Sequence, residues 1–100
     1  MATTTKALAR TAAATTSTTL YTVPSATTTV VTNIVVTNSA ASAATFTITL
    51  DGVDLFTSTA IAANTTAAFD LKQTLATTKI IAGLASATTV KFHISGVEIA

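Results

Sequence analysis

Apolar and polar residues alternate along several short stretches of this chain. The clearest is Ala44–Leu50, in which every second residue is apolar and threonine occupies the positions between. A period of two is typical of a β-strand with one face buried. Asp51 and Gly52 follow directly, and an Asp-Gly pair between two apolar runs is a strong hairpin signal. The pattern therefore predicts a strand at Ala44–Leu50, a tight turn, and a returning strand at Val53–Thr57.

Other apolar runs recur at short intervals, separated by turn residues such as Pro24, Asn64 and the small residues of Asn38–Ser42. The further strands that these runs predict are Leu20–Val23, Thr29–Thr37, Ala67–Leu71, Leu75–Leu84 and Val90–Ile99. No stretch has a convincing helical pattern. Short strands spaced about 8–12 residues apart are typical of an antiparallel sandwich or barrel. We expect an all-β fold, an antiparallel β-sandwich of seven to eight strands with jelly-roll or Ig-like topology.

The last predicted strand contains one irregularity. Before Gly96 the apolar positions are Phe92 and Ile94, and after it they are Val97 and Ile99, so the alternation shifts by one residue. A glycine at such a shift predicts a β-bulge in this strand.

The first 17 residues have a different character from the rest of the chain. They are rich in threonine and alanine, and Leu8 is their only large apolar residue after Met1. Such termini are commonly mobile. We therefore expect a flexible arm at residues 1–17 and a single β-sandwich domain at residues 18–100. No apolar run is long enough for a membrane span, and the segment after Arg10 is not the apolar core of a signal peptide.

The composition is short of charge. Threonine numbers 26 and alanine 21 of the 100 residues, only 9% are charged, and the net charge is +1. An ordinary soluble domain has about 25% charged residues. An exterior of threonine, alanine, serine and asparagine does little to repel neighbouring molecules, so we expect other subunits to cover much of it; a monomer kept soluble by hydroxyl groups is the alternative. The weak positive charge argues against a nucleic-acid binder, and the lack of cysteine excludes disulfides and thiolate zinc sites.

Residue types that could carry chemistry are few and scattered. His93 is the only histidine, which is too little for a zinc site. Asp51 and Asp54 could offer oxygens to calcium, but a hairpin turn explains them more simply. Nothing places two of the four carboxylates, which include Asp70 and Glu98, across a cleft. The glycines are isolated and form no phosphate-binding loop. We therefore predict no catalytic, cofactor-binding or metal-binding residues, no cofactor, and no enzymatic activity.

Thr45, Thr47 and Thr49 form a ladder of hydroxyl and methyl groups along one predicted strand. Ice-binding β-proteins present such arrays, which makes a secreted bacterial surface or ice-binding module one alternative. That function requires the ladder to be repeated in register on adjacent strands, and the sequence has no periodic repeat.

Several segments resemble small virion proteins of tailed bacteriophages, of the capsid decoration or cement type. The segments are Leu20–Pro24, Thr28–Asn38, Ile61–Asn64 and the ending Val90–Ile99, and the resemblance extends over about residues 18–100. It consists of strand and turn motifs and contains no catalytic signature. The resemblance implies a compact β-sandwich that decorates or cements a phage particle, often as a symmetric oligomer.

Composition and resemblance agree on a non-enzymatic structural protein of a tailed-phage virion, on the head surface. It would bind the major capsid protein or other virion proteins and form a homo-oligomer, with a trimer favoured. A tail, neck, baseplate or fibre accessory protein is the alternative within the virion. We expect neither nucleic acid nor membrane as a partner. The candidate interface residues come from the arm and from apolar residues that the alternation does not assign to the core. They are Lys6, Leu8, Arg10, Tyr21, Val35 and Phe56.

Overall fold

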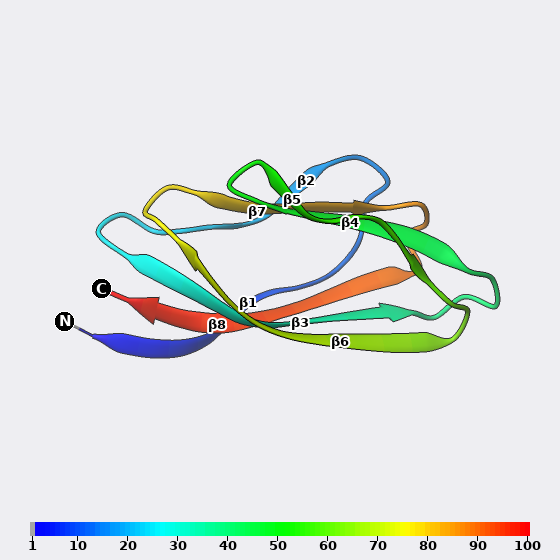
Figure 1. Cartoon of the computed structure of the whole chain (residues 1–100), viewed down its shortest axis with the longest axis horizontal. Helices are drawn as coiled ribbons and strands as arrows, with labels where there is room; N and C mark the ends of the chain where they lie inside the picture. Colours follow the sequence, from blue (N-terminus) through cyan, green and yellow to red (C-terminus); the bar gives the residue numbers. More distant parts are fainter. Residues whose placement is uncertain (1) are drawn as a thin grey trace.

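The computed structural model describes residues 2–100, which form eight β-strands and no helix (Figure 1). The strands are β1 (Thr3–Ala12), β2 (Thr18–Thr22), β3 (Thr28–Asn38), β4 (Ala44–Leu50), β5 (Val53–Ile61), β6 (Thr65–Leu75), β7 (Ile80–Ala85) and β8 (Val90–Ile99). Two four-stranded sheets pack face to face in an elongated body of 46 × 21 × 17 Å. The predicted all-β sandwich of seven to eight strands is confirmed.

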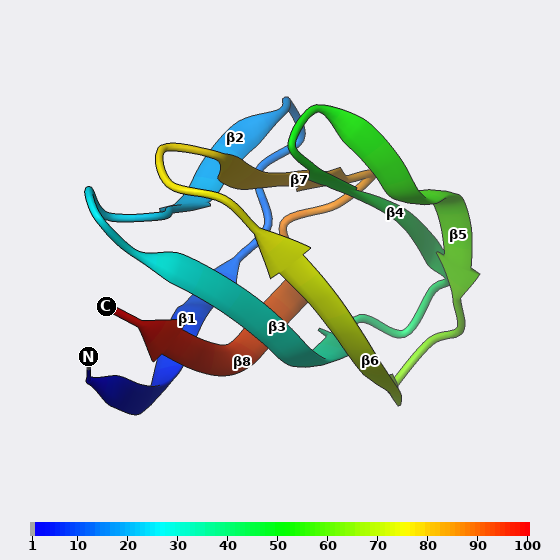
Figure 2. The same ribbon diagram turned by 60° about the vertical axis from the view of Figure 1, so that its left-hand side comes forward.

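The order of the strands identifies the topology. One sheet, called sheet A here, has the order β1-β8-β3-β6, and the other, sheet B, has the order β2-β7-β4-β5 (Figures 1 and 2). All neighbours are antiparallel, and the first strand pairs with the last, the second with the seventh, the third with the sixth and the fourth with the fifth. This is the pattern of one long hairpin folded over itself, which is an eight-stranded jelly roll. Of the two topologies predicted, the structure has the jelly roll.

The hairpin between β4 and β5 forms as the sequence predicts. Asp51 and Gly52 have φ angles of 54° and 76°, so both central residues of the turn lie in the left-handed region. A type I′ turn requires this, and its twist matches that of the two strands it joins. The returning strand is longer than expected, because β5 continues to Ile61.

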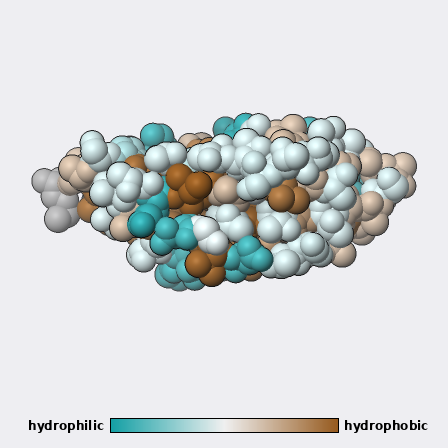
Figure 3. Space-filling view, turned by 90° about the horizontal axis from the view of Figure 1, so that it is seen from above, coloured by the Kyte–Doolittle hydropathy of each residue, from teal (hydrophilic) through white to brown (hydrophobic). Residues whose placement is uncertain are grey.

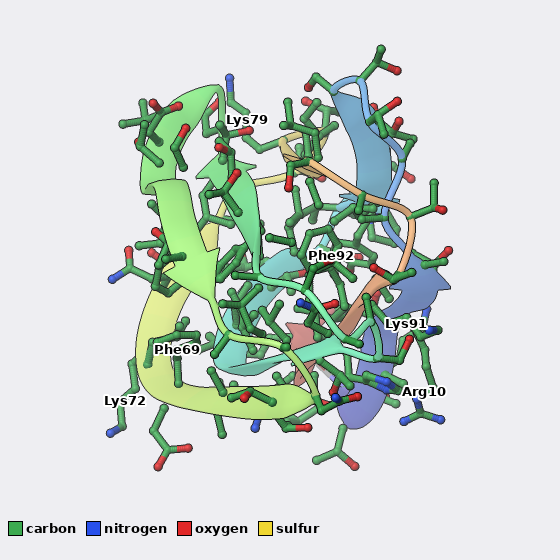
Figure 4. All side chains as sticks on the ribbon, turned by 90° about the vertical axis from the view of Figure 1, so that its right-hand side faces the viewer. Arg10, Phe69, Lys72, Lys79, Lys91 and Phe92 are labelled. Carbon is green, nitrogen blue, oxygen red and sulfur yellow. The ribbon has the colours of Figure 1, made fainter. Side chains whose placement is uncertain are left out.

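The core lies between the two sheets and is centred on aromatic rings. Phe46 of β4 has its ring centroid 5.6 Å from that of Phe56, 6.3 Å from Phe69 and 6.2 Å from Phe92. Phe46 and Phe92 are buried, while Phe56 and Phe69 are half-buried. Figure 4 shows Phe92 between the sheets and Phe69 directed inward from β6. The inward positions predicted for Phe46, Phe69 and Phe92 are confirmed.

The N-terminal segment differs from the flexible arm expected at residues 1–17. Thr3–Ala12 forms β1, the strand at one edge of sheet A, and pairs along its length with β8. Leu8 is 7% exposed and belongs to the core, and Ala2 and Ala100 exchange two backbone hydrogen bonds of 2.9 and 2.8 Å. The alternation of residue types missed β1 because most of its side chains are exposed, so the strand is held mainly by backbone groups. Met1 lies outside the described residues.

Gly96 has a different role from the predicted bulge. Strand β8 runs without interruption, and the extra residues lie in its two neighbours, at Leu8 of β1 and Thr32 of β3. A Cβ atom on Gly96 would lie 2.3 Å from the carbonyl oxygen of Val30, so the glycine permits close approach of β3. The alternation consequently continues through Gly96, and Glu98 instead of Val97 points inward.

The predicted strand Leu75–Leu84 is two strands in the structure. Leu75 is the buried last residue of β6, and β7 begins at Ile80. Between them the chain turns through Thr78, which has a φ of 69°. The Thr77 hydroxyl donates a hydrogen bond of 2.6 Å to the carbonyl oxygen of Pro24 and so fixes this turn on the loop after β2. The apolar run did not reveal the break because threonine and lysine also occur within strands.

Candidate interaction surface

Two outer sheet faces and four strand edges make up most of the surface. Within residues 2–100 we find no cavity or cleft and no group of three or more histidine, aspartate or glutamate side chains that could hold a metal ion. In the same range no helix is long and apolar enough to cross a membrane. His93 is half-buried on the outer face of sheet A, where its strand neighbours across the sheet are Arg10 and Val35.

The outer face of sheet B has almost no charge. Threonine side chains of β4 and small or apolar side chains of β7 alternate with the residues that point into the core. We call the resulting surface the uncharged face; its residues are Thr45, Thr47, Thr49, Ile80 and Leu84, all half-buried, and the buried Ala82 lies between Ile80 and Leu84. Strands β2, β4 and β7 contain no charged residue, and β5 contains only Asp54. The space-filling view from this side is mostly white, with brown patches near its centre and teal patches beside them and at the rim (Figure 3).

The charged groups on this side of the molecule gather at one end. Asp51 and Lys79 lie in the β4–β5 and β6–β7 turns and form an exposed ion pair, with 3.6 Å between Oδ1 and Nζ. Asp54 is nearby at the start of β5 and accepts a hydrogen bond of 2.9 Å from the Thr57 hydroxyl. Asp54 is paired across the sheet with Thr49, so this end of the uncharged face borders a carboxylate. Away from this end, around Thr45, Thr47 and Leu84, a partner can cover the face without removing an ion from water.

The threonine ladder of β4 is not repeated on the strands beside it. Thr47 and Thr49 are paired with Leu84 and Ala82 of β7, and Thr45 is paired with Ala60 of β5. An ice-binding array needs hydroxyl groups in register on adjacent strands, but the paired residues here are apolar, except that Asp54 of β5 is paired with Thr49. The ladder is the outward half of a strand that has one buried face.

The outer face of sheet A is the more polar of the two. Arg10, His93, Val35 and Ala68 form one row across its four strands, and Lys91 lies in the next row. Lys91 Nζ donates a hydrogen bond of 2.9 Å to Ser39 Oγ. In Figure 4, Arg10 and Lys91 share one corner of the molecule, and Lys72 projects from the opposite side. The two faces of the sandwich thus differ in charge.

The structure does not gather the six candidate interface residues on one surface. Arg10 and Val35 lie on the outer face of sheet A, Lys6 is exposed on β1, and Phe56 is half-buried on the edge strand β5.

Leu8 and Tyr21 are only 7% and 9% exposed and belong to the core. Both lie at or beside a register shift, in β1 and β2 respectively, which changes the direction of side chains relative to simple alternation. In this conformation both side chains contribute to the core of the chain itself.

A partly buried polar network at one end of the sandwich was not foreseen from the sequence. The Tyr21 hydroxyl donates a short hydrogen bond to Oε2 of Glu98 and lies 2.9 Å from Thr29 Oγ1. Lys6 Nζ is 3.4 Å from the same Glu98 oxygen. Because the Tyr21 proton is used toward Glu98, the Thr29 hydroxyl is the donor to Tyr21. The network joins β1, β2, β3 and β8 and so ties the two sheets together.

The same contacts shift the titration of Tyr21 and Glu98. Burial raises the pKa of Tyr21 above its ordinary value of 10.0, and the hydrogen bond to Glu98 raises it further. The hydrogen bond from Tyr21 lowers the pKa of Glu98 below 4.5, burial opposes this shift, and Lys6 assists it. The sequence signal for the network was the spacing Phe92, Ile94, Gly96, Glu98, which continues the inward alternation.

We expect Glu98 to contribute to the acid sensitivity of the fold. Because its pKa is lowered in the folded state, its contribution to stability is present above about 4.5 and is lost as the pH falls through the folded-state value. The variant Glu98→Gln should therefore unfold at a lower urea concentration than the wild type near neutral pH, and the difference should shrink in acid. Urea midpoints measured by circular dichroism across this range check the prediction. Asp70→Asn, which removes an exposed carboxylate, serves as control; equal pH dependence of Glu98→Gln and wild type would contradict the prediction.

Comparisons with known proteins do not assign this chain to a family. No protein-family description and no curated protein matches the sequence. Two solved structures, both of a pentameric capsid protein isolated from metagenomic phage sequences, are similar to 89% of this chain, with TM-scores of 0.43 and 0.39 and sequence identities of 20% and 19%. The matched region spans 57% and 59% of those two chains. At such TM-scores the likeness does not establish a shared topology, and the jelly roll is assigned from the strand order alone.

Proposed function

We propose that this chain is a non-enzymatic structural protein of a tailed-phage virion, which decorates or cements the capsid and stabilises the head by binding capsomers through the uncharged face. One observation carries the proposal: the adjacent strands β2, β7 and β4 present an outer face without a charged residue. A protein that works as a free monomer ordinarily distributes mixed charge over such a face.

Burial of the uncharged face is physically favourable. Ile80 and Leu84 offer apolar area, and the threonine hydroxyls can hydrogen-bond to a partner's backbone. No ion has to be desolvated there, so the large penalty for burying a charge does not arise. A specific interface buries about 800 Å² per partner, roughly one-sixth of the 5147 Å² that the chain exposes. Several contacts of this size around one copy would cover much of an exterior that has so little charge.

Two further observations support a role in a particle. The jelly roll is common in viral capsid domains, although it also occurs in lectins, so the fold by itself does not fix the function. The resemblance of residues 18–100 to small virion proteins points in the same direction as the composition. We propose the major capsid protein as partner and a homo-oligomer, with a trimer at a threefold position of the head as its preferred form.

A pair of matched variants tests the contact face. Leu84→Lys places a charge at a half-buried, outward position on the inner strand β7 of sheet B, and Val35→Lys does the same on the inner strand β3 of sheet A. We expect Leu84→Lys to weaken binding to phage particles that lack the protein by at least roughly tenfold, because the lysine must be desolvated at the interface. Val35→Lys should bind as the wild type does. Co-sedimentation of particles and protein gives the affinities, and circular dichroism confirms that both variants fold.

The reverse result would contradict the proposed face. If Val35→Lys abolished binding and Leu84→Lys did not, the contact would lie on the outer face of sheet A, where Arg10 and Val35 are found. Heating the decorated particles tests the cementing role, since bound protein should raise the temperature at which heads break. An unchanged temperature together with altered adsorption to cells would favour the tail, neck, baseplate or fibre alternative.

A further inference from the structure

We propose that the side of the sandwich bordered by β5 and β6 is the contact between copies of this chain, with β5 of one copy packed against β6 of the next around a threefold axis parallel to the strands. This contact would hold together the homo-trimer described above, so the inference rests on that part of the proposed function. The uncharged face stays free to bind a particle, because it is the outer surface of sheet B, whereas this side is formed by strand edges.

Apolar side chains on the β5–β6 side are incompletely buried. Within residues 2–100, seven partly buried apolar residues pack against the core, and five of them lie on β5 and β6. These five are Leu55, Phe56, Ala67, Phe69 and Leu71. The rings of Phe56 and Phe69 are 4.6 Å apart between centroids and close the space between the two sheets, yet both are only half-buried. A second copy that covered this side would remove the remaining apolar area from water.

The opposite side of the sandwich, bordered by β1 and β2, is closed within one chain. Leu8 of β1 and Tyr21 of β2 are only 7% and 9% exposed. The Tyr21 hydroxyl is bonded to Glu98 and Thr29, so its polar group is satisfied as well. Figure 2 shows β5 and β6 as the outermost strands of their sheets, with no strand beyond them. Of the two sides, the β5–β6 side therefore has more to gain from a neighbour.

Both strand edges on the β5–β6 side are irregular. Strand β5 has an extra residue at Leu55 and a second register shift beside Ser58, which has a φ of 42°. Strand β6 has its extra residue at Leu71 and Lys72, which together lie opposite Thr32 of β3. Such bulges interrupt the row of backbone donors and acceptors and disfavour the addition of another strand. A neighbouring copy is therefore expected to pack on the side chains of this side and not to extend either sheet.

The two strands carry opposite charges at similar heights along the sandwich. Asp54 is the only charged residue of β5, and Lys72 is the only cation of β6. From the contact between Phe56 and Phe69, both charges lie toward the end where the β4–β5 and β6–β7 turns meet. Asp54 is two residues from Phe56 and Lys72 is three from Phe69, a difference of about 3.3 Å in strand length. Rotation about an axis parallel to the strands preserves height, so it brings Asp54 of one copy beside Lys72 of the next.

Both charged side chains are available for this contact. Asp54 and Lys72 are exposed. The ion pairs found within residues 2–100 involve Lys6 and Lys79, and neither pair includes Asp54 or Lys72. Figure 4 shows Phe69 and Lys72 on the β6 side of the molecule, with Lys72 projecting away from the sandwich. Two independent features, incomplete apolar burial and complementary charge, therefore point to another copy of this chain as the occupant of the same side.

Charge reversal tests the polar part of the contact. Sedimentation velocity over a range of protein concentrations measures association of the wild type, of Asp54→Lys, of Lys72→Asp, and of the variant that combines both substitutions. Each single reversal places like charges at all three contacts, so the concentration at which half the chains are trimeric should rise by roughly tenfold or more. The double variant restores opposite charges and should associate as the wild type does. Added salt should reduce the differences between the variants.

Hydroxyl-radical footprinting tests the apolar part of the contact. Phe56 and Phe69 should be oxidised more slowly at protein concentrations at which the trimer forms, because a neighbouring copy then covers both rings. Phe92 is buried within the chain itself and should show the same oxidation at all concentrations. Equal oxidation of Phe56 and Phe69 in monomer and trimer would place the contact elsewhere and overturn the proposal.

Lys91→Asp is the control for charge reversal, because it makes the same change of charge as Lys72→Asp on β8, away from β5 and β6. It should leave the trimer unchanged. The proposal is overturned if the wild type is monomeric or dimeric at all concentrations, if the trimer resists the single reversals, or if the double variant does not recover association.

Co-sedimentation with phage particles separates this contact from the rest of the proposed function. A monomer that still binds particles, and loses binding on Leu84→Lys, would remove the β5–β6 contact and leave the uncharged face as the particle-binding surface. A trimer that depends on Asp54 and Lys72 but does not bind particles would support the β5–β6 contact and contradict the capsid role.

Discussion

Replacement of Gly96 by alanine is expected to destabilise the fold by about 3 kcal/mol, toward the upper end of the cost of overpacking a core. The added Cβ would lie 2.3 Å from the carbonyl oxygen of Val30 and 2.8 Å from Cδ1 of Leu8. The Leu8 side chain can rotate, but the Val30 carbonyl belongs to β3, so β8 and β3 would have to separate in the middle of sheet A. A domain of this size has a total stability of about 5–15 kcal/mol, so the loss is a large fraction of it. Urea unfolding followed by circular dichroism measures the change.

Gly52→Ala provides the control for Gly96→Ala. Gly52 lies in the β4–β5 turn with a φ of 76°, and a Cβ there would meet no atom within 4 Å. The only cost is that of holding alanine in the left-handed region, about 1 kcal/mol. Equal losses in the two variants would show that the close approach of β3 to Gly96 does not determine its identity.

Truncation of Phe46 to alanine is expected to cost about 3–5 kcal/mol, as other buried phenylalanines do. The ring of Phe46 is 1% exposed and contacts aromatic rings from β5, β6 and β8, so its removal leaves a cavity in contact with both sheets. Its neighbours are held by regular strand pairing and cannot collapse fully into the space. We expect a large fall in the urea midpoint, together with faster proteolysis of the native protein.

Val53→Ala is the control for Phe46→Ala, because it removes an apolar side chain from an exposed position instead of a buried one. Val53 is 69% exposed at the start of β5 and borders no cavity. Its truncation should change stability by no more than about 0.5 kcal/mol. A cost for Val53→Ala close to that for Phe46→Ala would be incompatible with the core described here.

The local patterns of the sequence correctly predicted those parts of the fold that depend only on residues close together in the chain. Alternation in Ala44–Leu50 reports one buried and one exposed face, and Asp51–Gly52 supplies the two left-handed residues of the turn. The inward positions of Phe46 and Phe92 follow from the same period of two. Each of these features depends on residues within one strand or one hairpin, where spacing alone decides which side a side chain faces.

Other parts of the candidate surface depended on contacts between residues far apart in the chain. The sequence expected Tyr21 at an interface, but the structure places it in the core, where it donates to Glu98, 77 residues away. The separation of charge between the two faces likewise appears only when β2, β7 and β4 are brought together in one sheet. No local pattern encodes which strand will be whose neighbour.

The sequence by itself determined that the chain is built of short antiparallel strands, where its tight turn lies, and that its exterior has unusually little charge. Only the tertiary structure decided that the strands form a jelly roll, that Thr3–Ala12 is the edge strand β1 rather than an arm, and that Gly96 allows close approach to Val30. The physical reason is that alternation and turn residues act through neighbouring atoms. Pairing of the first strand with the last, and of the second with the seventh, is chosen instead by how all eight strands bury their apolar faces at once.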